Sequence, residues 1–161
     1  MNDHENTSMI PATEIAEALP TLDVAAALAD APSSMYSSLV PATDADRATF
    51  FNGVNAPKYR IADEIGKTIA IRDVYVEAIA VKDEKAEDEN ATKQAPRIVL
   101  FDDKGEGHIC VSMGILTALR KLFAIYGRPT WTTPVVVLVK QVNTTPTRKM
   151  LTLEVVAPAK K

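Results

Sequence analysis

One stretch decides the order of the elements: residues 97–127, which read RIVLFDDKGEGHICVSMGILTALRKLFAIYG. The apolar run Arg97–Phe101 predicts a strand, and His108–Val111 predicts another. Between them, Asp102–Gly107 is polar and offers two glycines for positive φ, as hairpin turns require. We therefore expect two antiparallel strands joined by a tight turn.

A helix follows the hairpin. From Ile115 to Tyr126 the apolar residues recur at intervals of one, three or four, which is the period of one helical stripe. Ser112 is a candidate N-cap, and Gly127 is a candidate C-terminal stop with a proline just beyond it.

Upstream, Lys67 to Lys82 alternates like a strand, but its apolar parity slips near Arg72 and Asp73, which predicts a bulge. Lys82 to Ala95 is polar and acidic, and we expect a long loop there. Pro96 is expected to start the next strand, where its missing N–H does least harm.

Downstream, residues 135–142 and 149–156 predict two more strands, joined by a loop at 143–148. Five strands with one helix between the third and the fourth is the connectivity of the OB-fold barrel. We therefore expect a mainly β fold, a five-stranded OB barrel with an N-terminal helical or disordered extension.

Charge divides the chain unevenly. Residues 1–60 carry a net −5, residues 61–96 a net −4 and residues 97–161 a net +6, which add to −3. Residues 1–46 hold eight acids and no lysine or arginine. We expect an acidic low-complexity extension over 1–43, an OB domain over 44–157 and a frayed tail over 158–161.

Two shorter elements are expected before the first long strand. Thr43 is a candidate N-cap of a helix that ends at Asn52-Gly53. Ile61–Gly66 resembles a single helical turn that Gly66 stops.

Enzymatic chemistry is poorly represented. The single cysteine, Cys110, lies in an apolar strand, which favours a small buried hydrophobe over a nucleophile. No cysteine-based metal site and no complete dinucleotide loop is present, so we expect no cofactor and no metal. The sequence shows no membrane span and no secretory signal, and we expect a cytoplasmic protein.

Nucleic-acid binding is better represented. Proteins that hold single strands need cations along a groove and aromatic faces for bases to stack on. In an OB barrel that surface comes from strands two and three and the flanking loops. The candidate residues are Arg72, Tyr75, Lys93, Arg97, Phe101, His108, Trp131, Lys140, Arg148 and Lys149, with Lys85 in the acidic loop.

The aromatic candidates each have a second interpretation. Phe101 can lie in the core or stack against a base. Tyr75 can pack its ring in the core while its hydroxyl stays exposed to solvent. Trp131 lies in a Pro-Thr-Trp-Thr segment and can plug the end of the barrel. Arg148 and Lys149 can equally be a solvated surface.

Several segments together resemble a known family. They are Phe50-Phe-Asn-Gly-Val-Asn55, Asp73-Val-Tyr-Val-Glu77, Pro96-Arg-Ile-Val-Leu-Phe-Asp102, Val111-Ser112, Gly127-x-Pro-Thr-Trp131, Val139-Lys-Gln141 and Lys149-Met-Leu-Thr-Leu153. Their order over about residues 47–156 resembles the small single-stranded-DNA-binding proteins of phages and mobile elements of Gram-positive bacteria. The resemblance implies an OB-fold protein that coats single-stranded DNA in replication or recombination, with dimers or multimers on the DNA.

Two further expectations concern partners. The acidic segment is expected either to compete with DNA for the basic face or to recruit replication or recombination proteins. The alternative to DNA binding is an OB-type protein-interaction module of a replication or phage complex.

Overall fold

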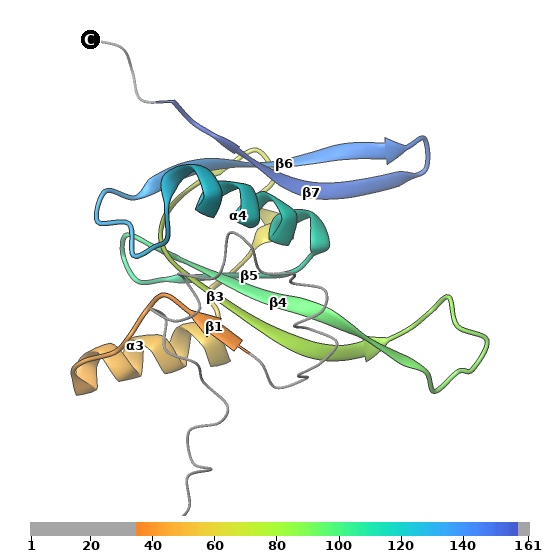
Figure 1. Cartoon of the computed structure of the whole chain (residues 1–161), viewed down its shortest axis with the longest axis horizontal. Helices are drawn as coiled ribbons and strands as arrows, with labels where there is room; N and C mark the ends of the chain where they lie inside the picture. The colour runs from red at the N-terminus through yellow and green to blue at the C-terminus, as the bar shows by residue number, and fades with distance from the viewer. Residues whose placement is uncertain (1–34, 158–161) are drawn as a thin grey trace, which may run out of the picture.

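The computed structural model describes residues 35–157 (Figure 1). The elements in chain order are β1 (Met35–Ser37), α3 (Asp44–Asn55), β2 (Tyr59–Arg60), the 3-10 turn η3 (Ile61–Asp63), β3 (Thr68–Lys82), β4 (Thr92–Asp102), β5 (Gly107–Val111), α4 (Met113–Tyr126), β6 (Val135–Thr145) and β7 (Arg148–Val155).

All strands join one curled, mixed sheet in the order β2-β5-β4-β3-β6-β7, with β1 paired to β3. The mainly β class is confirmed, as are the five long strands with a helix between the third and the fourth. The sheet does not close into the expected barrel. The described residues contain no pairing between β5 and β7, so the sheet forms a half-barrel. Instead α4 packs against β7, so closely that a Cβ on Gly114 would lie 2.1 Å from the Leu151 carbonyl oxygen.

Strand β3 is the centre of the sheet because it pairs with β1, β4 and β6. Its register shifts between Ile71 and Asp73, which confirms the predicted bulge at Arg72. The bulge reverses the alternation, so that Ile71 and Val74 are both buried in the same core.

The strand ends differ from the predicted ones. Residues 92–95 extend β4 and pair with the end of β3 down to Lys82 opposite Thr92, so the expected loop shrinks to residues 83–91. Pro96 lies inside β4, opposite Ala78, rather than at its start. The strand tolerates it there because β5 reaches only as far as Arg97, which leaves one side of Pro96 unpaired. The loop at 143–148 is likewise a tight turn, because β6 and β7 pair out to Thr145 and Arg148.

The capping predictions are confirmed. Ser112 Oγ accepts a hydrogen bond from the Ile115 amide, and Thr43 Oγ1 accepts one from the Asp46 amide. Gly127 ends α4 with a φ of 80°. Helix α3, however, continues through Gly53 to Asn55, because this glycine is needed for a close contact rather than a stop.

Two apolar clusters hold the fold together, one on each face of the sheet. On the concave side α4 lies between β4–β5 and β6–β7 (Figure 1), where its apolar stripe packs against Ile98, Val137 and their neighbours. On the outer side α3 covers β3 and β4 and forms a smaller cluster around Tyr75, Val99 and Phe101.

Part of the expected N-terminal extension lies in the sheet. Met35–Ser37 pair with Tyr75–Glu77 as β1, and Tyr36 is buried in the larger core, where its ring meets Phe123 edge to face. Residues 1–34 and 158–161 of the expected extension and tail lie outside the described residues. Neither described helix is long and apolar enough to cross a membrane.

Candidate nucleic-acid interface

The surface expected to bind DNA is the outer face of β4, where Arg97, Val99 and Phe101 share one parity. In the structure α3 covers this face. Phe101 and Tyr75 are only 2% and 3% exposed, and Phe50 of α3 meets both rings edge to face. Helix and sheet come this close because residue 53 is glycine: a Cβ there would lie 2.2 Å from the Phe101 ring. Neither ring presents an open face to a base.

Arg97 ties α3 to the sheet. Its guanidinium donates a hydrogen bond to the Val54 carbonyl oxygen, one of the last carbonyls of the helix, and lies 3.8 Å from the Glu77 carboxylate. The Tyr75 hydroxyl donates to the same carboxylate. Burial, reinforced by that carboxylate, raises the pKa of Tyr75 above its usual value. The positive charge of Arg97 is therefore already shared between a helix C-terminus and an acid.

Beside α3 the surface is hollowed on two sides of one aromatic ring. One hollow of about 450 Å³ has apolar walls that include Met35, Phe50 and Tyr75, with Arg47 at its rim. A second, of about 280 Å³, lies against Asn55, Glu77 and Arg97. Phe51 and Val54 line both, and Phe51 is 64% exposed. We call these two hollows together the α3 groove.

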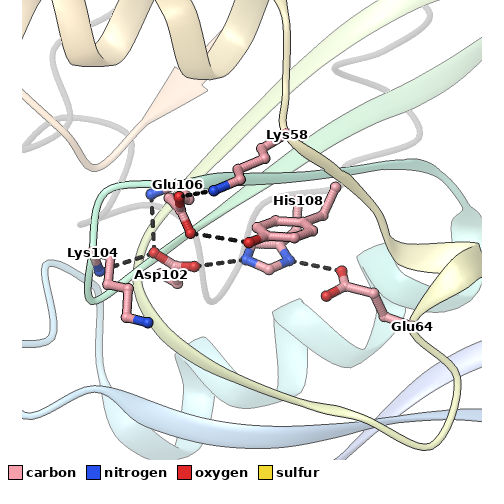
Figure 2. Close-up of polar contacts among 7 residues, drawn as sticks. Lys58, Glu64, Asp102, Lys104, Glu106 and His108 are labelled. Carbon is pink, nitrogen blue, oxygen red and sulfur yellow. Dashed lines mark hydrogen bonds and ion pairs between the residues drawn. The ribbon is translucent and has the colours of Figure 1, made fainter.

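His108 lies in a buried polar network. The carboxylates of Asp102 and Glu64 flank its imidazole (Figure 2), at 2.8 Å from Nε2 and 2.7 Å from Nδ1. Both ring nitrogens of His108 therefore face a carboxylate oxygen. The Tyr59 ring stacks on the imidazole at 4.7 Å, and Lys58 and the Tyr59 hydroxyl both bind Glu106. His108 thus joins the segment after α3 to the β4–β5 turn, and its side chain is buried.

Asp102 organises that turn. One carboxylate oxygen accepts from the amides of Lys104 and Glu106, and the other faces His108. Burial by itself would raise the pKa of Asp102, but the hydrogen bonds from His108 and the two amides outweigh it and hold that pKa below its usual range.

Trp131 plugs the large core. It is 7% exposed, its indole N–H donates to the Gly127 carbonyl oxygen, and its ring meets Phe123 edge to face. Arg72 is exposed at the bulge, and its carbonyl accepts the Trp131 amide. This hydrogen bond therefore links the bulge in β3 to the segment that carries Trp131.

The remaining cations among the predicted DNA-binding residues lie on two hairpins that project from the body (Figure 1). The β6–β7 hairpin carries exposed Arg148 and Lys149 at its turn and Lys140 further back, bound to Glu154 at 2.7 Å. No acid occurs between Lys140 and Glu154, and we call residues 140–149 the basic hairpin. Lys93 and Lys85 lie on the β3–β4 hairpin, whose turn at 83–91 holds five acids.

The ten predicted residues thus separate into groups. Tyr75 and Arg97 meet at the α3 groove, and Arg148 and Lys149 meet on the basic hairpin with Lys140. Lys93 lies on the acidic hairpin and Arg72 at the bulge, while Phe101, His108 and Trp131 are buried. Sequence reasoning missed Phe51 and Arg47. The signal for Phe51 was a second phenylalanine beside Phe50 on a helix with a narrow apolar stripe, since two adjacent side chains cannot both face the sheet.

The family model described as phage single-stranded DNA-binding protein, of the Phi29 type, matches residues 30–156. The chain belongs to this family. Neither a curated protein nor a solved structure matches it.

Membership settles the class of activity. Members of the Phi29 phage single-stranded DNA-binding protein family bind DNA and catalyse no reaction, so this member is a DNA-binding protein and not an enzyme. The match begins ahead of β1 and ends after β7, so it includes α3 and every described strand.

The His108 network predicts acid sensitivity. Because the pKa of Asp102 is lowered in the folded state, its carboxylate stabilises the fold above its unfolded pKa, and that stabilisation is lost as the pH falls through the folded pKa. We expect Asp102→Asn to lower the free energy of unfolding at about pH 7 by about 3 kcal/mol, since it removes one carboxylate charge from the buried network around His108. As the pH falls through and below the folded pKa of Asp102, the two proteins should converge.

Urea denaturation followed by Trp131 fluorescence measures this, with Asp103→Asn as the matched control because Asp103 is exposed. A deficit that stays at its full size at about pH 3 would show that the carboxylate charge is not its source.

Proposed function

We propose that this protein coats single-stranded DNA without sequence preference during phage DNA replication or recombination. The observation that carries the proposal is the family match over almost the whole folded chain. Phosphate neutralisation and base stacking are the two interactions that such binding needs.

The basic hairpin is the proposed phosphate contact. Arg148 and Lys149 are exposed, and no acid lies within the hairpin itself. Lys140 is bound to Glu154, but both side chains are about half exposed, and such surface pairs contribute about 0–1 kcal/mol. A phosphate can therefore replace Glu154 at little cost.

The half-barrel supports an OB-type architecture for this function. Strand β3 pairs with both β4 and β6, and α4 connects β5 to β6, as in an OB barrel. We propose that the chain is an open OB barrel in which the packing of α4 on β7 replaces the last strand pairing.

The acidic segment ahead of β1 suggests a regulatory contact. Residues 1–34 contain six acids and no lysine or arginine, and they lead directly into a strand beside α3. We propose that this segment competes with DNA for cationic side chains, or that it recruits replication or recombination proteins.

Salt dependence tests the phosphate contact. Affinity for oligo-dT should fall steeply between about 50 and about 200 mM salt, because each contacted phosphate releases a counterion. Arg148→Ala and Lys149→Ala should each lower the magnitude of the log–log salt slope by about 0.7.

Lys121→Ala is the matched control, because Lys121 is exposed on α4 and belongs to neither hairpin. Fluorescence anisotropy gives the slopes, and duplex DNA of the same length should bind more weakly. An affinity for oligo-dT that does not change with salt concentration, or no binding to oligo-dT at all, would instead favour the alternative that this protein is a protein-interaction module.

Deleting residues 1–34 leaves β1 in place and tests the acidic segment. If the segment competes with DNA, the shortened chain binds oligo-dT more tightly at low salt, and the gain disappears at high salt because the competition is electrostatic. Equal affinity at all salt concentrations would rule out competition and leave the recruiting role.

A further inference from the structure

We propose that the α3 groove is a base-binding subsite in which a DNA base stacks on Phe51. This inference rests on the proposed function and assigns its stacking component to one residue. It also moves that component away from the aromatic residues that the sequence suggested, since Tyr75, Phe101 and Trp131 are all buried.

The exposure of Phe51 is the first observation. Its neighbour Phe50 packs into the outer cluster, whereas Phe51 stands between the two hollows and is 64% exposed. A phenyl ring gains by burial, so a flat ligand that covers this ring would be stabilised by the contact. A planar, apolar ligand that enters either hollow would lie against this ring.

The walls suit a nucleobase. The larger hollow is lined by Met35, Phe50 and Tyr75, and its volume is that of a small-ligand site. Bases stack on aromatic side chains regardless of sequence, because every base has a π face. The groove therefore matches a ligand class that is flat and apolar on its faces.

Arg47 supplies a cation at the rim. Its side chain is 62% exposed and binds the Asp44 carboxylate, which is itself 98% exposed, at 2.7 Å. Exposed ion pairs of this kind are weak, so a backbone phosphate next to a stacked base can take the place of Asp44.

Contacts with the sheet fix the position of α3, the helix that carries Phe51. Gly53 lets α3 rest directly on the Phe101 ring, and Arg97 binds the Val54 carbonyl at the end of the helix. Arg97 is thus a positioning residue for the groove rather than a phosphate contact. Little ordering of the backbone remains when a base arrives, because the helix that carries Phe51 is already in place.

The charge balance separates this subsite from the basic hairpin. Asp44, Asp46 and Glu77 lie on or beside the groove and offset the two arginines. The stacking contact itself, unlike the contact of Arg47 with a phosphate, should therefore strengthen binding without adding to the release of counterions. In Figure 1 α3 and the turn of the basic hairpin lie at opposite corners of the molecule, so the two contributions should add.

The test uses the full chain and oligo-dT. Phe51→Ala should weaken binding by roughly 5- to 150-fold, the loss measured for removal of one base-stacking ring, while the salt slope stays unchanged. Phe51→Trp should keep the affinity, and its added emission should be quenched by oligo-dT. Ile125→Ala and Ile125→Trp are the matched controls, because Ile125 is 76% exposed on α4, away from the groove.

The outcomes are distinguishable. A Phe51→Ala variant that binds oligo-dT within about twofold of the parent overturns the subsite. If the parent itself fails to bind oligo-dT, the proposed function falls and the subsite falls with it. Thermal unfolding of each variant checks that the fold is intact, which we expect because the ring is mostly exposed.

Discussion

The close approach of α3 to the sheet at Gly53 is the contact on which the functional surface depends. With no Cβ at residue 53, the helix lies directly on the Phe101 ring, and that contact buries Tyr75 and Phe101. The same placement turns Phe50 inward and leaves Phe51 outward between the two hollows. A side chain at residue 53 would lift the helix and abolish the groove, because both helix and sheet are close-packed there.

Polar contacts hold the two ends of this arrangement. Arg97 binds the carbonyl end of α3, and the His108 network fixes the segment that follows the helix to the β4–β5 turn. Buried networks of this kind stabilise a fold only when every member has its partners. Here the imidazole has two carboxylates and Asp102 has two backbone amides as well. His108, a candidate DNA contact by sequence, is thus buried in a network that joins the segment after α3 to the β4–β5 turn.

Local patterns predicted the strands, the hairpin, α4 and the bulge at Arg72, because periodicity and capping depend on neighbouring residues. They did not predict what covers the outer face of β4. That outcome depends on Gly53 meeting Phe101 and on Arg97 reaching Val54, which are contacts between residues far apart in the chain. The predicted β4–β5 hairpin implies that Asp102 lies near His108. No local pattern in the sequence indicates that Glu64 also contacts His108. Strand ends were misplaced because β3–β4 and β6–β7 continue as polar hairpins beyond the core, where apolar alternation no longer marks them.

Amide chemical-shift mapping of the full chain with oligo-dT tests the central claim most directly, because it shows at once which surfaces the DNA contacts. We expect the largest changes in two separate places: residues 47–55 of α3 with their neighbours on β3 and β4, and the turn around Arg148 and Lys149. The buried surroundings of Trp131 should change little. Changes confined to α4 and to residues 128–134, with none in α3, would contradict the account.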